Sequence, residues 1–300
     1  MLYRRSVFFY CCLIFLSGSA FAQKWPGIVL YNLEVNSISK HLIIDPAVRI
    51  DKGKYSYPVP TPPEAFEGTN SHEVLEGLFN RFDKEEYPQG RNLEVYVGGN
   101  RCGTATVTVL DTLNSCSPVV SEVEVSDSSC FYGQGLAIVT ATPLKKFLQF
   151  AIDSAREASI LQYGKNEFLR RGIKKEIADK IYIFELRGSD LDGDGKPEYL
   201  VTYTIIGEEV HNGEYDMQYS LTTILQPDSA GYTPVFTHYP DPGIPPETHY
   251  YHMVDALDFD GEGICKVLYQ KRNLSSWDYV LVKKVDGVWT EVYEGAGGGC

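Results

Sequence analysis

The chain has 300 residues, of which 40 are Asp or Glu and 27 are Lys or Arg, so its formal net charge is −13. Nucleic-acid binding depends on Lys and Arg that neutralise phosphates, and anionic membrane surfaces attract clusters of the same residues. The acidic composition therefore argues against both kinds of partner. The 21 tyrosines, together with frequent Val and Thr, favour β structure.

The first 22 residues have the pattern of a signal peptide. Arg4 and Arg5 precede an apolar stretch over residues 7–16, and an A-x-A pattern ends at Ala22. This stretch is shorter than the roughly 20 residues of a helix that spans a bilayer. We therefore expect cleavage after Ala22, which leaves a secreted or periplasmic protein that is still more acidic and has no transmembrane segment. An uncleaved N-terminal anchor is the alternative.

Residues 23–142 are expected to form a β-rich domain with one helix. The helix is predicted over residues 71–83, because apolar side chains recur there at helical spacing after a serine suited to cap the first turn. A glycine pair within residues 98–100 predicts the turn of a β-hairpin. The predicted strands, including the two of this hairpin, cover residues 28–35, 41–44, 93–97, 104–109, 119–125 and 136–140.

Five cysteines remain once the signal peptide is removed: Cys102, Cys116, Cys130, Cys265 and Cys300. Disulfides are permitted in an exported protein, and an odd number leaves at least one thiol free or paired with another chain. Three of the five lie in the β-rich domain, so a bridge among Cys102, Cys116 and Cys130 is expected. The sequence does not fix the pairing, and no C-x-x-C motif suggests a metal or redox site.

Residues 143–180 are expected to form a helical segment between two β-rich regions. Apolar residues recur at helical spacing from Leu144 onward, and breaks are expected at Gly164 and Gly172. Several Lys and Arg residues gather in this segment. A solvated helix face is the simplest interpretation of them.

An acidic loop over residues 190–198 carries the clearest chemical signal. Asp190, Asp192, Asp194 and Glu198 occupy its positions 1, 3, 5 and 9. Carboxylates this close repel one another unless a cation lies among them, and hard oxygen ligands suit Ca²⁺. The two glycines of the loop permit a tight turn. An acidic surface turn without metal is the alternative.

The sequence after this loop argues against an EF-hand, which requires Glu at position 12 and a helix on each side. Position 12 is Val201, and residues 199–206 are rich in β-branched and aromatic residues, which predicts a strand. A nine-residue acidic loop that leads into a strand resembles the calcium loops of FG-GAP and VCBS repeats, which occur in β-propeller blades. The resemblance implies one structural Ca²⁺ and the following ligands: Asp190, Asp192, Asp194, Glu198 and the backbone carbonyl of Lys196.

The loop has an echo at residues 258–263, and both copies are followed by strand patterns of similar spacing. Residues 181–294 are therefore expected to form a pair of blade-like β-meander repeats. Two units cannot close a propeller, which typically needs about 4–8 blades. The repeats must pack on each other, on the N-terminal domain or on another chain. Residues 295–300, rich in glycine, are expected to be a flexible tail.

The second loop differs from the first at one position, where Lys266 replaces Glu198. An ammonium group among Asp258, Asp260 and Glu262 can supply the charge that a metal supplies elsewhere. We therefore expect one calcium site.

No catalytic motif emerges, so we assign no catalytic residue. G-x-S-x-G and H-E-x-x-H are absent, and the histidines at 238, 249 and 252 lie near a Pro-rich loop without a recognisable metal-site spacing. The sequence thus predicts a mainly β (α+β) fold and an exported calcium-binding protein that acts as a binding or interaction module. The partner, a protein or a glycan, is not specified. A secreted hydrolase whose catalytic residues match no motif is the alternative.

Overall fold

The computed structural model describes residues 27–35, 41–59, 71–110, 119–140, 144–211, 214–229, 231–240, 249–273 and 276–299. The predicted signal peptide, Cys116 and Cys300 lie outside these residues. The predicted mainly β class is confirmed, since strands far outnumber helices. Among the residues described, no helix is both long enough and apolar enough to cross a membrane.

The N-terminal domain is a closed ring of six antiparallel strands. The strands of this domain are β1 (Ile28–Val35), β2 (Leu42–Asp51), β3 (Lys54–Ser56), β4 (Asn92–Val97), β5 (Asn100–Leu110), β6 (Ser121–Val125) and β7 (Gln134–Ile138). The ring order is β1-β7-β4-β5-β6-β2, and β2 pairs back to β1. The short strand β3 pairs with the end of β2. Helix α1 (Ser71–Glu86) packs on this ring through the buried Phe82 and includes the predicted helix.

Local chemistry accounts for two features of this ring. Gly98 and Gly99 both have positive φ, 62° and 73°, so they form the tight turn that joins β4 to β5 as predicted. Cys102 on β5 is bridged to Cys130, with a Cα–Cα distance of 5.8 Å. The sequence predicts a bridge among the three cysteines of this domain, and the structure identifies this pair. Cys265 is free and buried.

The C-terminal part contains two successive four-stranded antiparallel meanders. The first meander consists of β9 (Tyr182–Ser189), β10 (Glu198–His211), β11 (Glu214–Asp228) and β12 (Gly231–His238), with β8 (Gln149–Phe150) added at the β9 edge. The second meander consists of β13 (Tyr250–Leu257), β14 (Lys266–Arg272), β15 (Ser276–Val285) and β16 (Val288–Gly299). In each meander the acidic loop joins the first strand to the second.

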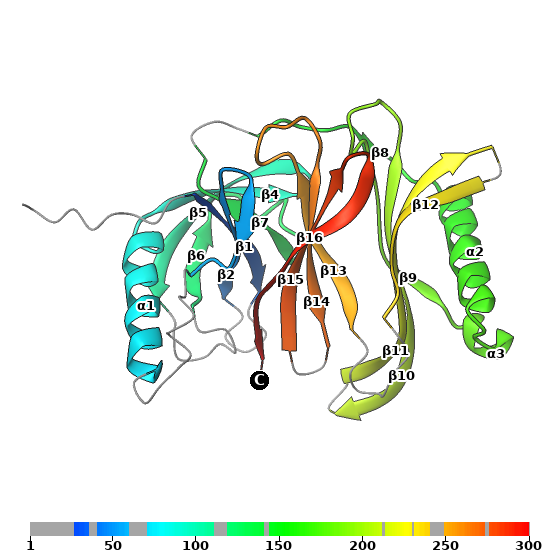
Figure 1. Ribbon diagram of the computed structural model, residues 1–300, viewed down its shortest axis with the longest axis horizontal. Helices are drawn as coiled ribbons and strands as arrows, with labels where there is room; N and C mark the ends of the chain where they lie inside the picture. Colours follow the sequence, from blue (N-terminus) through cyan, green and yellow to red (C-terminus); the bar gives the residue numbers. More distant parts are fainter. Residues whose placement is uncertain are drawn as a thin grey trace, which may run out of the picture.

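The elements stack in layers, as Figure 1 shows: α1, the ring, the second meander, the first meander, and then α2 (Ser154–Arg170) with α3 (Lys175–Ala178). A separate hydrophobic cluster fills the ring and each of the three interfaces that follow. Strand β10 illustrates the pattern: Tyr199, Val201 and Tyr203 pack in the cluster with α2, whereas Leu200 faces the second meander. Successive side chains of a strand point to opposite faces, so this strand is buried on both.

The helical segment differs from the prediction at its start and in its middle. Residues 144–153 are not helical: part of this stretch forms β8, which pairs with Gly188 and Ser189 of β9. Helix α2 begins at Ser154, after Asp153 caps it, and it continues through Gly164 without a break. The apolar spacing fits a helix, but pairing with a strand that is distant in the sequence determines the conformation.

The predicted flexible tail is also wrong for residues 295–299, which form the end of β16 and pair with β15. Ala296 is buried in the interface with the ring. A Cβ atom on Gly297 would lie 1.6 Å from the carbonyl oxygen of Trp277, so only glycine permits this close approach. The glycine run therefore serves strand packing.

Candidate metal centre

The acidic loop between β9 and β10 folds around Asp190. One oxygen of Asp190 accepts a hydrogen bond from the backbone N–H of Gly193 at 2.8 Å, and the other accepts from that of Gly195 at 3.1 Å. Both glycines have positive φ, 79° and 83°, a conformation in which a side chain would be strained. The sequence pattern of aspartates and glycines thus sets the path of the loop.

This path brings three of the predicted ligands together. Carboxylate oxygens of Asp190, Asp192 and Asp194 all lie within 4.8 Å of one another, and the three can hold a metal ion. Asp190 is buried, Asp192 is half-buried and Asp194 is exposed. The pKa of Asp194 is lowered, mainly because the backbone N–H of Lys196 donates to its carboxylate. Asp194 therefore favours its anionic form, and the group is open to solvent on its side.

The other two predicted ligands flank this group. Glu198 is 1% exposed, and its two oxygens accept hydrogen bonds from the N–H of Leu191 at 2.7 Å and from the side chain of Gln226 at 3.1 Å. Burial raises the pKa of Glu198 despite these donors. The side chain of Lys196 lies 3.3 Å from Asp194. The structure thus places Glu198 beneath the loop, outside the group of three carboxylates.

The second loop has the same backbone path. Gly261 and Gly263 have φ values of 78° and 86°, and the N–H of Gly263 donates to Asp258 at 2.8 Å, as Gly195 does to Asp190. The residues that follow each first aspartate, Leu191 and Phe259, are both buried. The two loops, one from each meander, therefore share geometry as well as sequence.

The predicted role of Lys266 agrees with the structure. Its ammonium group lies 3.4 Å from Asp258 and 3.1 Å from Glu262 and also contacts Asp260, while the lysine is only 1% exposed. Burial alone would lower the pKa of Lys266, but hydrogen bonds to Asp260 and Glu262 and the charge of Asp258 outweigh it and raise the pKa. The ammonium group of Lys266 thus lies among the carboxylates of the second loop.

The two loops contact each other directly. The N–H of Cys265, just after the second loop, donates to the carbonyl of Leu191 in the first loop at 2.8 Å. The segment before β8 also contacts the first loop, because the carbonyl of Leu148 accepts a hydrogen bond from the N–H of Asp190 at 2.9 Å. Lys145 forms a backbone bridge with Asp258 in the second loop. The segment that leads into β8 therefore lies against both loops, at the junction of the two meanders.

Sequence reasoning missed one charged neighbour of the candidate metal group. Lys284 on β15 lies 2.8 Å from Asp192, and both side chains are mostly buried, with exposures of 22% and 12%. Its neighbour Lys283 contacts Glu262 of the second loop at 3.1 Å. The strand β15 thus supplies one lysine to each loop. Asp192 and Lys284 are far apart in the sequence, so no local pattern indicated this contact.

The three histidines near the Pro-rich loop contact different partners. His238 stacks on Tyr251 at 4.1 Å and lies 3.3 Å from Glu291. His252 lies 2.8 Å from Glu185, and the third histidine contacts a side chain in the turn after β14. Within the described residues, the groups of acidic, His and Cys side chains that can hold a metal do not include a histidine. None of these contacts favours the hydrolase alternative.

Comparison with known proteins assigns no family and no function to this site. No protein-family model, no curated protein and no solved structure matched this chain. The resemblance to FG-GAP and VCBS repeats therefore stays a prediction from the loop residues. The site itself is a group of three carboxylates that can hold a metal ion, beside a related loop that holds a lysine.

Proposed function

We propose that this chain is an exported calcium-binding protein, in which one Ca²⁺ stabilises a β scaffold used for binding. The observation that carries the proposal is the contrast between the two loops. At the position where the second loop has Lys266 the first loop has Glu198, and Asp190, Asp192 and Asp194 of the first loop lie within 4.8 Å of one another. In the second loop one buried ammonium group contacts three carboxylates, whereas the lysines beside the first loop, Lys196 and Lys284, contact Asp194 and Asp192 from its exposed side and from β15. A bound cation would balance the remaining negative charge of the first loop.

Calcium suits this loop better than magnesium or a transition metal. All the predicted ligands are oxygens, which hard cations prefer. Ca²⁺ accepts about 6–8 oxygen ligands in flexible geometry, whereas Mg²⁺ demands near-ideal octahedral coordination. The ligands proposed are Asp190, Asp192, Asp194, Glu198 and the backbone carbonyl of Lys196. Glu198 would bind the ion in place of its hydrogen bond to Leu191 or to Gln226. Solvent can complete the coordination, because Asp194 is exposed.

A cation at this position would stabilise more than its own loop. The loop lies against the second loop and against the segment that leads into β8, so the metal would act where the two meanders meet. It would also relieve the repulsion of a protein with 40 acidic side chains. A ligand that binds only the folded state adds about 2.7 kcal/mol of stability at a hundred times its Kd.

Export is proposed from the N-terminal pattern, and the Cys102–Cys130 bridge agrees with an oxidising compartment. The partner proposed for the scaffold is a protein or a glycan. The acidity of the chain argues against nucleic acid.

Calcium titration by calorimetry, combined with thermal melts in calcium and in chelator, tests this function. We expect one bound ion and a higher Tm in calcium. The variant Asp194→Asn should abolish both, because it removes a ligand charge at an exposed position with only local contacts. The matched control Asp286→Asn removes the same charge from the exposed turn between β15 and β16 and should change neither. Absence of binding at millimolar calcium would refute the proposal.

A further inference from the structure

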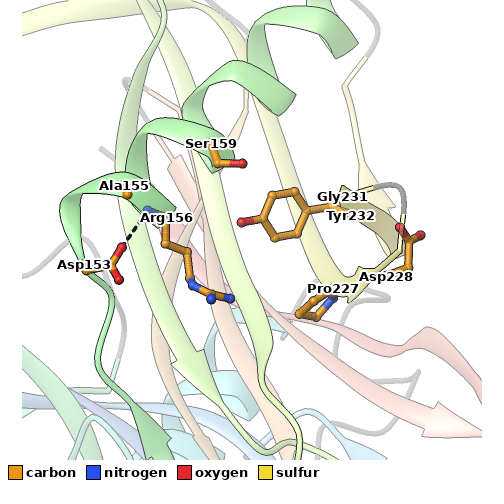
Figure 2. A pocket seen from close by; sticks show the side chains of 8 residues that line it. All are labelled: Asp153, Ala155, Arg156, Ser159, Pro227, Asp228, Gly231 and Tyr232. Atoms are coloured by element: carbon orange, nitrogen blue, oxygen red, sulfur yellow. Dashed lines mark hydrogen bonds between the residues drawn. The ribbon is translucent and has the colours of Figure 1, made fainter.

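A cavity opens on the outer side of the first meander, and its lining residues lie outside both acidic loops. It has a volume of about 410 Å³ and lies between the first turns of α2 and the β11–β12 hairpin (Figure 2). Small-molecule sites in proteins commonly span roughly 300–1,000 Å³. Its lining residues are Asp153, Ala155, Arg156, Ser159, Pro227, Asp228, Gly231 and Tyr232.

The wall formed by α2 is held rigidly on the sheet. The hydroxyl of Tyr203 donates to the carbonyl of Ile160 at 2.8 Å, and a Cβ atom on Gly164 would lie 2.5 Å from the ring of Tyr203. Ile160 and Phe168 are fully buried beneath the helix. The helix therefore cannot collapse into the cavity, and the site is preformed.

Tyr232 provides the aromatic surface of the cavity. Its ring is half-buried and meets the rings of Tyr163 and Tyr199 edge-on, at centroid distances of 6.2 and 5.9 Å. These contacts fix the orientation of the ring on two sides. An anchored aromatic face loses little conformational entropy when a ligand packs on it.

Arg156 provides anchored donors. Its Nη1 donates to the hydroxyl of the buried Tyr199 at 2.5 Å, and its guanidinium carbon lies 5.5 Å from the centre of that ring. The guanidinium has five N–H donors in a planar fork, so four are left for other acceptors. Figure 2 shows Arg156 and the hydroxyl of Tyr232 converging on one space, with Asp153 and Asp228 at opposite ends.

The charges of the cavity disfavour an anion as the natural ligand. Its lining has two carboxylates and one guanidinium, and the backbone N–H of Arg156 in the first turn of α2 already donates to Asp153 at 2.7 Å. The charged lining likewise disfavours an apolar ligand. A neutral molecule with many hydroxyl groups matches this lining, because it can donate to Asp228, accept from Arg156 and stack its C–H face on Tyr232.

We propose that this cavity binds a neutral saccharide, such as the terminal residue of a glycan. Planar carboxylate and guanidinium groups form paired hydrogen bonds with neighbouring hydroxyls, and the ring of Tyr232 takes the apolar face of the sugar. A saccharide would be the ligand of the binding scaffold proposed above, and in that respect the inference rests on the proposed function. The sugar would contact none of the proposed calcium ligands, since none of the lining residues belongs to either acidic loop.

The test uses the purified protein and the methyl glycosides of glucose, galactose, mannose and N-acetylglucosamine, with saturation-transfer NMR and titration. We expect at least one glycoside to bind with a Kd of about 1 mM, which is a free energy of about −4 kcal/mol. Binding should persist in chelator, which separates this result from the outcome of the calcium test. Tyr232→Ala should weaken binding at least tenfold.

Because Tyr232→Ala also removes packing, Ser159→Trp provides an independent variant. Ser159 is exposed on α2, so a tryptophan there fills the cavity without removing a core contact and should block binding. Tyr132→Ala, a change at a tyrosine that is 86% exposed on the N-terminal domain, should leave binding unchanged. The proposal is overturned if no glycoside binds at about 10 mM, if Ser159→Trp binds normally, or if only anions such as acetate and phosphate bind.

Discussion

The replacement Lys266→Glu tests the logic of the two acidic loops most directly. It gives the second loop the residue that the first loop has at the same position, Glu198. If the lysine stands in for a metal, the variant should lose stability in chelator and gain a second calcium site. The expected stoichiometry therefore changes from one ion to two, measured by calorimetry.

The size of the loss follows from the contacts of Lys266. Removing one partner of a buried ion pair costs about 3–5 kcal/mol, because the remaining charge stays buried without compensation. Asp258 and Asp260 have side-chain exposures of 2% and 13%, whereas Glu262 is 50% exposed and contributes little. We therefore expect about 3 kcal/mol from loss of the ammonium, and more when a fourth carboxylate replaces it.

Urea denaturation in chelator and in calcium measures both effects. Calcium at a thousand times its Kd restores about 4 kcal/mol, which is enough to offset most of the loss. Lys266→Met is the matched control: it removes the same ammonium group but supplies no ligand, so it should be destabilised and should gain less from calcium. A loss below about 1 kcal/mol for both variants in chelator would show that the ammonium is not needed, and the reasoning would fail.

Three further predictions concern single residues. Lys284→Met removes an ion pair worth about 1 kcal/mol from the acidic loop; calorimetry should show roughly fivefold tighter calcium binding. Gly164→Ala should destabilise the protein by about 1–3 kcal/mol in urea denaturation, because the new methyl group meets the ring of Tyr203; Gly77→Ala in open space on α1 should instead stabilise it by about 0.5–1 kcal/mol. Burial raises the pKa of Asp83 from 3.8 to about 6, so the folded state keeps a proton that the unfolded state loses, and stability falls as the pH rises through this range. Asp83→Asn should therefore add up to about 3 kcal/mol at pH 7 and almost nothing at pH 3, measured by urea denaturation at both values.

Local patterns predicted where several strands and the acidic loop lie, although β2 continues to Asp51, beyond the predicted range 41–44, and β5 begins at Asn100, before the predicted range 104–109. Strand β1 covers the range that alternation indicated, and the glycine turn after β4 lies where its two glycines require it. The contact of Lys266 with its carboxylates was also predictable, because all four residues belong to one short stretch of the chain. These features depend on side chains that are close in sequence.

The incorrect predictions concern contacts between residues that are far apart in sequence. The spacing from Leu144 onward fits a helix, but β8 forms because its residues pair with β9, on the far side of α2 and α3 in the sequence. The glycines after Tyr293 suggested a mobile tail, yet they pair with β15 and let the chain approach Trp277. The ion pair of Lys284 with the acidic loop is likewise a long-range contact. Sequence periodicity carries no information about such partners.

The stacking of the layers explains how two blade-like units are stable without closing a ring of blades. The meanders contact each other through positions that are equivalent in the repeat: Arg187 lies 2.6 Å from Asp255, and Glu185 accepts a hydrogen bond from the N–H of Met253, with the same separation in sequence for both pairs. Every repeat in such a stack has two faces to bury, so the terminal units need a cover.

The described structure provides a cover of a different kind at each end. Helix α2 packs on the outer face of the first meander. The ring packs on the outer face of the second, where the buried Asp45 of β2 accepts hydrogen bonds from Tyr279 at 2.7 Å and from Trp277 at 3.2 Å. Because these covers replace further blades, Asp45→Ala, which removes the acceptor of Tyr279 and Trp277, should weaken the contact of the ring with the second meander and lower the hydrogen-exchange protection of β14 and β10 together. Loss of protection confined to the ring would show instead that the meanders are stable by themselves.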